Sequence, residues 1–166
     1  MQHIIALITL ITALATPSPH QFAKSGDISD EMIPEGWEFV GSAMGDLNGD
    51  GRADMIVVAR PDEKPLAAVY WDNGNGQWEL VKEYNNAFRS FDQMPYTPEF
   101  LIEITEQGDL KIELYDPEQF DFSISSSYMF RSKDGEFILE KEERESGDNH
   151  ISADGSSLKL GDFEID

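Results

Sequence analysis

The chain has 166 residues, of which 40% are hydrophobic and 11% aromatic, enough for a packed core and against wholesale disorder. Its 33 acidic and 12 basic residues give a formal net charge of −21, which argues against a surface for nucleic acid or anionic lipid. Because there is no cysteine, the sequence excludes disulfides, thiolate metal sites, cysteine nucleophiles and a lipid-modified N-terminal cysteine.

Residues 1–15 have the pattern of an export signal. Ile4 to Ala15 is an apolar run of suitable length, and Ala13-Leu14-Ala15 fits a small-x-small cleavage site. The run is too short to span a bilayer, so we expect no membrane span after cleavage. The preceding Met1-Gln2-His3 lacks Lys and Arg, which leaves a short buried helix or an uncleaved anchor as alternatives. The signal predicts export to the periplasm, the cell surface or the medium.

Residues 16–33 are polar and contain Pro17 and Pro19, which predicts a flexible linker. We expect residues 34–166 to form a single β domain because apolar and polar residues alternate with period two along several runs. The expected strands are residues 37–43, 53–59, 66–71, 78–84, 100–105, 110–115, 122–130, 137–139 and 158–160. In the fourth, Trp78, Leu80 and Tyr84 are expected on one face. The charged residues 140–149 are expected to be a solvated connection.

The acidic loop, residues 46–54, separates the first two expected strands. Oxygen-bearing side chains fall at its first, third, fifth and ninth places, and Gly51 holds the sixth. This spacing suits Ca²⁺, which takes six to eight oxygen ligands, and a glycine there permits a sharp turn. The predicted ligands are the side chains of Asp46, Asn48, Asp50 and Asp54 and the backbone carbonyl of Arg52.

A helix–loop–helix calcium hand and a hairpin without metal are the alternatives to this calcium site. A helix–loop–helix calcium hand requires a bidentate Glu at the twelfth place, but Val57 stands there and begins no helix. The apolar, β-branched run after the loop instead predicts a buried strand. The second alternative is a hairpin without metal, because Asp, Asn and Gly favour turns in any case.

The segment from Gly45 to Val58 resembles the calcium repeat of integrin α-subunit propellers and their bacterial relatives, the FG-GAP/VCBS repeats. The resemblance implies a calcium loop between neighbouring strands of a propeller blade, with the five predicted ligands in the family's positions. The wider chain resembles small exported proteins of Bacteroidota-type bacteria that carry an Ile-Pro-x-Gly-Trp segment, here Ile33 to Trp37. That second resemblance brings no assigned activity.

A closed propeller takes at least four blades, but the chain has only one such loop. We therefore expect an all-β fold of compact antiparallel sheets, comprising one or two propeller-blade-like units and no closed ring. Residues 99–142 are candidates for a second, degenerate set of strands.

The predicted function is that of an exported, non-enzymatic calcium-binding domain, in which calcium stabilises the fold and the domain binds a protein or glycan partner. The alternative is a secreted hydrolase or glycan-binding protein that uses the aromatic loop, residues 85–98. Its aromatic side chains can equally pack over one end of a sheet. Histidine-based catalysis is disfavoured because only His20 and His150 follow the signal, both in polar segments.

Overall fold

The computed structural model describes residues 25–26, 32–116, 124–133, 135–146, 149–154 and 157–166. The expected export signal lies outside these residues. The described elements are β1 (Ser25–Gly26), β2 (Glu38–Gly45), β3 (Asp54–Arg60), β4 (Leu66–Asp72), β5 (Trp78–Tyr84), the 3-10 helix η2 (Phe91–Gln93), β6 (Glu99–Ile104), β7 (Leu110–Tyr115), β8 (Ile124–Lys133), β9 (Glu136–Ser146) and β10 (Asn149–Asp154). Within this part of the chain, no helix has the length and apolar character needed to span a bilayer.

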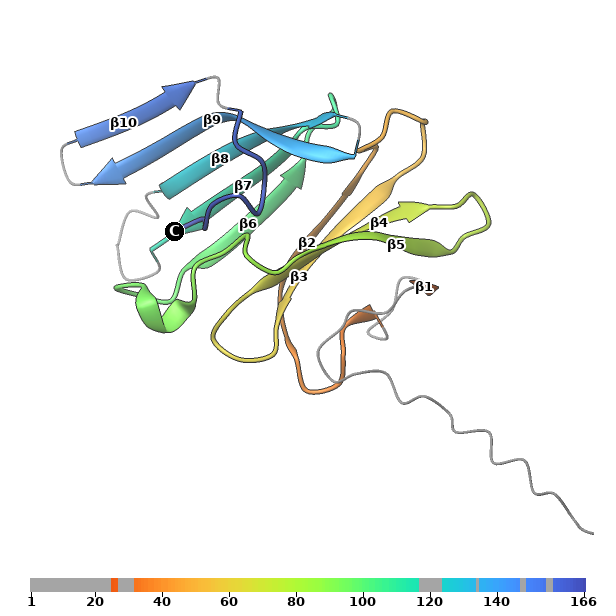
Figure 1. Cartoon of the computed structure of the whole chain (residues 1–166), viewed down its shortest axis with the longest axis horizontal. Coiled ribbons are helices and arrows are strands. Elements are labelled where there is room, and N and C mark those ends of the chain that lie inside the picture. Colours follow the sequence, from red (N-terminus) through yellow and green to blue (C-terminus); the bar gives the residue numbers. More distant parts are fainter. Residues whose placement is uncertain (1–24, 27–31, 117–123, 134, 147–148, 155–156) are drawn as a thin grey trace, which may run out of the picture.

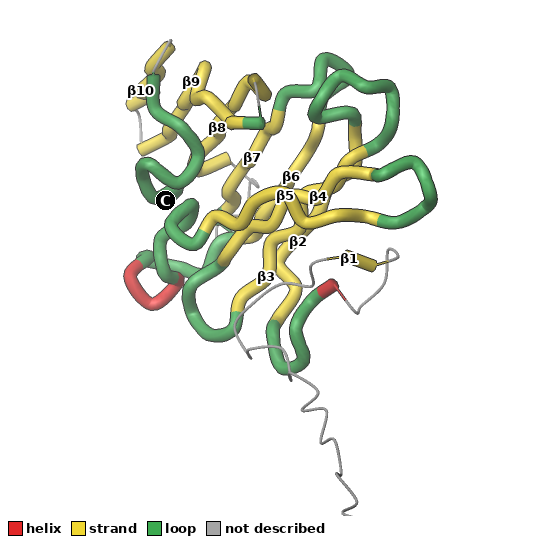
Figure 2. Tube along the Cα trace, turned by 45° about the vertical axis from the view of Figure 1, so that its right-hand side comes forward, coloured by secondary structure: helices red, strands yellow, loops and turns green. Residues whose placement is uncertain are grey.

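The strands form two five-stranded antiparallel sheets (Figures 1 and 2). The first sheet has the order β1-β5-β4-β3-β2, and the second has the order β10-β9-β8-β7-β6. Four consecutive strands of the first sheet, and all five of the second, pair with their neighbours in sequence, and a propeller blade has four strands paired in this way. Neither described sheet closes on itself, so the expectation of blade-like units without a closed ring is confirmed.

The inner faces of the two sheets pack on each other and enclose the larger core. The first sheet contributes Ile56, Val58 and Val69, and the second contributes the completely buried Ile112 and Phe130 among others. The strands β2 and β6 lie side by side where the sheets approach most closely. A Cβ atom on Gly45 of β2 would lie 2.5 Å from Cγ2 and 2.8 Å from Cβ of Ile104 of β6, so a residue without a side chain is needed there.

The outer face of the first sheet is apolar and carries a second, smaller core. Met55, Val57 and Tyr70 belong to this core and alternate with inner-face residues along their strands. Met32 and Trp37, which precede β2, cover it. Because both of its faces are covered, β3 reads as a continuous apolar run, in which residues 54–59 are all buried. Within the predicted linker, Ser25–Gly26 pairs with β5 and Met32 is 2% exposed.

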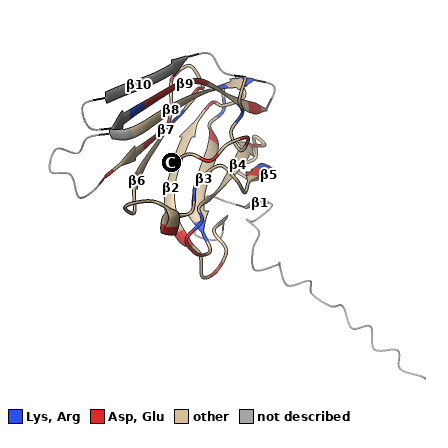
Figure 3. Ribbon diagram, turned by 60° about the vertical axis from the view of Figure 1, so that its left-hand side comes forward, with Lys and Arg blue, Asp and Glu red and all other residues tan. Residues whose placement is uncertain are grey.

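The outer face of the second sheet is polar by contrast. It carries the ion pairs Lys111–Glu113, at 2.9 Å, and Lys141–Glu143, at 2.7 Å. Glu113 is buried and also accepts a hydrogen bond from the Tyr115 hydroxyl at 3.1 Å. Figure 3 shows the distribution of charge over the strands. Another apolar sheet could not pack on this face without burying charged groups, at a cost in free energy.

The aromatic loop contributes mainly to the core. Phe88 is completely buried and Phe91 is 7% exposed, and their rings lie 5.4 and 5.7 Å from that of Phe100. The Arg60 guanidinium lies 4.8 Å from the Phe91 ring centroid. The structure therefore favours packing of this loop over one end of a sheet. Phe88 and Phe91 are buried, so neither ring is available to bind a glycan.

Residues 157–166 join the second sheet to the aromatic loop. The Leu160 N–H donates to the Phe137 carbonyl at 2.9 Å, and the Ile165 N–H donates to the Ala87 carbonyl at 2.8 Å. Leu160 and Ile165 are both buried in the larger core. The expected strand at 158–160 is reduced to one isolated bridge between Lys159 and Ile138.

Two further strand predictions were wrong. Residues 140–146 continue β9 instead of forming a solvated connection, because residues 141–144 extend the backbone ladder with β8, to which Arg131 of β8 adds an ion pair with Glu140. In β5, a bulge between the partners of Val69 and Tyr70 reverses the alternation. As a result Trp78 and Leu80 face the smaller core, whereas Tyr84 faces the larger one.

Candidate metal centre

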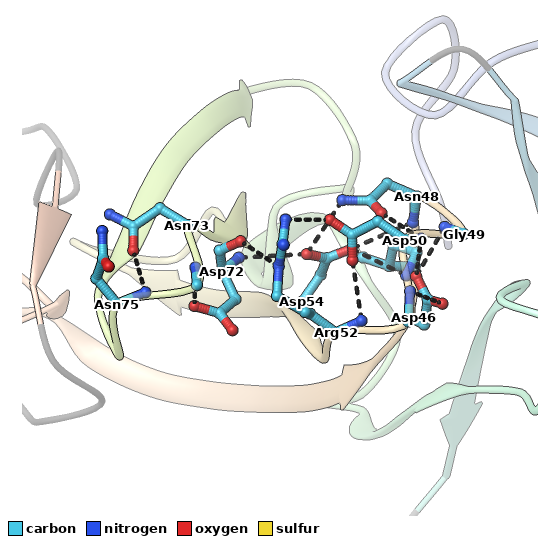
Figure 4. Close-up of polar contacts among 12 residues, drawn as sticks. Asp46, Asn48, Gly49, Asp50, Arg52, Asp54, Asp72, Asn73 and Asn75 are labelled. Carbon is cyan, nitrogen blue, oxygen red and sulfur yellow. Dashed lines mark hydrogen bonds and ion pairs between the residues drawn. The ribbon is translucent and has the colours of Figure 1, made fainter.

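The acidic loop joins β2 to β3, and the last strand pair before it is Gly45 with Asp54. The prediction of a loop between two antiparallel strands is therefore confirmed. Gly51 has φ +82° and Gly49 has φ +79°, a backbone conformation that side-chain-bearing residues rarely adopt. These two glycines let the loop turn back on its own carboxylates (Figure 4).

Asp46, the first residue of the loop, organises the turn. Its Oδ1 accepts hydrogen bonds from the N–H groups of Gly49 at 2.7 Å and Asp50 at 3.1 Å, and its Oδ2 accepts one from Gly51 at 2.8 Å. These N–H groups, that of Gly51 foremost, hold the pKa of Asp46 below its ordinary value. The side chain is therefore a carboxylate at neutral pH.

Asp54 closes the loop from the buried end of β3. It is completely buried, and its carboxylate accepts hydrogen bonds from the N–H groups of Leu47 at 3.0 Å, Asn48 at 3.2 Å and Asp72 at 3.3 Å. Burial raises the pKa of Asp54 above its ordinary value, and the charge of Asp50 adds to the rise, while the N–H groups oppose it. The folded state therefore holds a carboxylate that a nearby cation would stabilise.

Asp50 and Arg52 form an ion pair within the loop. The Asp50 Oδ1 also accepts a hydrogen bond from the Arg52 N–H at 2.9 Å, and the Arg52 Nε–H donates to the Asp72 carbonyl at 3.1 Å. Figure 4 shows Arg52 between the acidic loop and the turn after β4. The guanidinium therefore supplies positive charge to a loop that is otherwise acidic.

The donor set fits a hard divalent cation, since all of its groups are oxygens: three carboxylates, the Asn48 carboxamide and the Arg52 carbonyl. In the structure, however, the three carboxylates of this donor set do not converge on a common point that could hold an ion. Across the described ranges, no three Asp, Glu, His or Cys side chains are grouped so as to hold a metal ion. Asp46 and Asp54 bind backbone N–H groups, and Asp50 binds Arg52. The assignment of these residues as metal ligands stays a prediction.

The second sheet holds the acidic loop in place through residues that the sequence did not single out. The Ser132 hydroxyl of β8 donates to the Leu47 carbonyl at 2.5 Å. Gly108, in the turn between β6 and β7, lies so close to Asp46 that a Cβ atom would come within 2.5 Å of the Asp46 carbonyl oxygen. Gly108 reads in the sequence only as a turn residue, because its contact with Asp46 joins two distant parts of the chain.

The strand–loop–strand unit and its glycines are similar in sequence to a known repeat family. Residues 40–77 match the family model of the FG-GAP repeat. The match spans most of β2, the whole acidic loop, β3 and β4. No curated protein and no solved structure matches the chain. The FG-GAP repeat thus coincides with the part of the chain in which the five predicted ligands lie.

The other predicted features of chemical interest are only partly described. His20 lies outside the described residues, and for His150 the structure describes only the backbone, in β10. The aromatic loop has been assigned to the core above. The FG-GAP repeat is therefore the strongest candidate site in the described structure.

Proposed function

We propose that the protein is an exported, non-enzymatic interaction domain whose FG-GAP repeat binds calcium and thereby stabilises the fold. The observation that carries the proposal is that five oxygen donors at calcium-loop spacing lie in a strand–loop–strand unit matched by the FG-GAP family. Export, as expected from residues 1–15, suits a site of modest affinity because calcium is abundant outside the cytosol.

The side chains of Asp46, Asn48, Asp50 and Asp54 and the carbonyl of Arg52 would hold the ion. The ion would supply positive charge to a loop in which Asp54 is completely buried and repelled by Asp50. The Arg52 guanidinium pairs with Oδ2 of Asp50, so it would compete with the ion for the charge of this carboxylate. Arg52 is thus an internal competitor for the same carboxylate.

The contribution to stability follows from linkage. An ion that binds only the folded chain adds RT ln(1 + [Ca²⁺]/Kd), about 1.4 kcal/mol at a tenfold excess over Kd. The loop is well placed to stabilise more than its own hairpin, since Gly108 and Ser132 of the second sheet contact Asp46 and Leu47. Ordering this loop would also strengthen the packing of the second sheet against it.

An interaction role is favoured over catalysis by the composition of the site. The carboxylates of Asp46 and Asp54 accept three backbone N–H groups each, all from the acidic loop except that of Asp72. A general base has to reach a substrate proton, which carboxylates occupied in this way do poorly. The partner would be a protein or a glycan.

The calcium proposal is tested by thermal unfolding of the full chain in calcium and in chelator. Chelator should lower the Tm of the wild type, and Asp50→Ala should abolish this difference. Asp92→Ala removes the same charge from an exposed position in η2 and should leave the difference intact. A wild-type Tm that is identical in calcium and in chelator would overturn the proposal.

A further inference from the structure

A cleft of about 420 Å³ opens beside the acidic loop, between the two sheets. Its walls come from the acidic loop, from Trp71 of β4, from the turn between β6 and β7 and from the β8–β9 hairpin. The volume falls within the range of roughly 300–1,000 Å³ typical of small-molecule sites. The cleft therefore brings together segments that are widely separated in the sequence.

Glycines line this cleft beside Trp71, which is partly buried against the larger core. Gly49, Gly108 and Gly135 all line it, so no side chains project into it at these places. A Cβ atom on Gly135 would lie 3.9 Å from Cη2 and Cζ2 of Trp71, in van der Waals contact with the indole. The six-membered ring of Trp71 thus faces a hairpin position that carries only hydrogen.

The polar groups of the lining combine donors and acceptors. Asn48 and Gln107 carry carboxamides, Glu106 carries a carboxylate and Ser132 a hydroxyl. All the formal charges of the lining are negative, and the chain has a net charge of −21, so anionic ligands are disfavoured.

The choice between a cationic and a neutral ligand depends on Asp46. Its two carboxylate oxygens already accept three backbone N–H groups of its own loop, and the proposed calcium ion would use the same carboxylate, so Asp46 is not available to a second cation in the cleft. The remaining carboxylate, that of Glu106, lies on an exposed turn where solvent and salt weaken charge–charge attraction. The Asn48 carboxamide and the Ser132 hydroxyl make hydrogen bonds within the fold, so the accessible lining consists of one indole ring, the Gln107 carboxamide and the Glu106 carboxylate.

We infer that this cleft binds a neutral carbohydrate, with the apolar face of a sugar ring against Trp71 and its hydroxyl groups on Glu106 and Gln107. An indole provides a large, rigid apolar surface, a carboxamide can both donate to and accept from hydroxyl groups, and a carboxylate accepts from them. This inference rests on the proposed role as an interaction domain, for which it names the ligand class, and does not require calcium to bind.

Binding can be followed through the indole N–H signals of the ¹⁵N-labelled full chain, which contains three tryptophans. The neutral probes are maltohexaose, cellohexaose, mannohexaose and chitohexaose at millimolar concentration. We expect at least one to shift the Trp71 signal saturably while those of Trp37 and Trp78 stay in place. Trp71→Phe assigns the signal and should weaken binding.

Gln107→Ala changes an exposed turn residue without touching the core, and should weaken binding about fivefold, as the loss of one net hydrogen bond would. Gln93→Ala is the matched control, because Gln93 is an exposed glutamine in η2, outside the cleft lining. Equal affinities of the wild type and Gln107→Ala would contradict the assignment of the cleft.

Two charged probes separate the rival ligand classes. Arginine amide represents a cationic ligand, and hexagalacturonate an anionic one. Saturable binding of either charged probe without binding of any neutral oligosaccharide would overturn the inference, as would failure of all four neutral probes. Each titration is run in calcium and in chelator. Sugar binding in both supports the cleft assignment whatever the calcium melting experiment gives, because that experiment alone decides the calcium proposal.

Discussion

Gly108 and Asp46 are in close backbone contact although the turns that carry them connect strands of different sheets. A Cβ atom on Gly108 would lie 2.5 Å from the Asp46 carbonyl oxygen, closer than real side chains allow. Gly108 also has φ +82°, so its conformation is one that glycine adopts most readily. The acidic loop is therefore positioned by the second sheet as well as by its own hairpin.

This contact predicts that Gly108→Ala is unusually damaging. The positive φ alone costs about 1 kcal/mol for alanine, and displacing a packed backbone adds roughly 1–3 kcal/mol. Gly76→Ala is the matched control, because Gly76 has φ +72° but nothing within 4 Å of its Cβ position. Urea unfolding should show a much larger loss of unfolding free energy for Gly108→Ala. Equal losses would mean that the loop moves aside at no cost.

Removing the internal competitor should strengthen calcium binding. In Arg52→Ala the Asp50 carboxylate no longer pairs with a guanidinium, so we expect a calcium affinity about fivefold higher, corresponding to the roughly 1 kcal/mol of an exposed ion pair. Isothermal titration calorimetry measures the change. Lys141→Ala removes the same charge from the outer face of the second sheet and controls for net charge. A lower affinity in Arg52→Ala would show that Arg52 supports the site.

The effect of calcium on stability should disappear in acid. The pKa of Asp54 is raised above its ordinary value of 3.8, so the folded state without calcium disfavours the Asp54 carboxylate. As the pH falls through this raised pKa, protonation relieves that cost in the calcium-free protein and removes a calcium ligand. The Tm difference between calcium and calcium-free buffer should therefore be full at about pH 7 and shrink toward about pH 4.

The pKa of Asp46 is shifted downward, so Asp46 stays ionised over this range and does not set the midpoint. Melting curves in calcium and in calcium-free buffer, recorded at several pH values, give the profile directly. A Tm difference that persists undiminished below the ordinary pKa of an aspartate would exclude Asp54 as a ligand.

The aromatic loop should behave as core. Phe91→Ala removes a ring that is 7% exposed and packs on Phe100, so we expect a loss of about 3–5 kcal/mol in unfolding free energy. Tyr96→Ala, at a partly exposed position of the same loop, should cost less. Urea unfolding compares the two variants. Unchanged stability in Phe91→Ala would reopen this loop as a binding surface.

Local patterns in the sequence predicted most of the first sheet. The Asp/Asn/Gly spacing and the apolar run after Asp54 correctly indicated a hairpin followed by a strand buried on both faces. The side-chain identities also identified the oxygen donors. They did not show that Arg52 would pair with Asp50, because Arg52 entered the prediction only through its backbone carbonyl.

The errors have common physical causes. A bulge in β5 moved Tyr84 to the opposite face from Trp78, and a period-two pattern contains no sign of an extra residue. The charged stretch 140–146 became a strand because it continues the hydrogen-bonded ladder with β8, to which the cross-strand ion pair of Arg131 with Glu140 adds. The contact of Gly108 with Asp46 depends on how two sheets dock, which no local window of sequence encodes.

The outer faces of the two sheets differ, since that of the second sheet is polar and that of the first is apolar, so the two ends of the pair of blades are not equivalent. In arrays of repeated units, a terminal repeat whose outer face is polar acts as an end cap and stops the stack. Glu113 and Lys111 place such a cap on the second sheet, whereas the first sheet presents an apolar face that Met32 and Trp37 cover. An additional blade grafted before β2 would thus meet a surface suited to packing, and one grafted after β9 would meet buried charge.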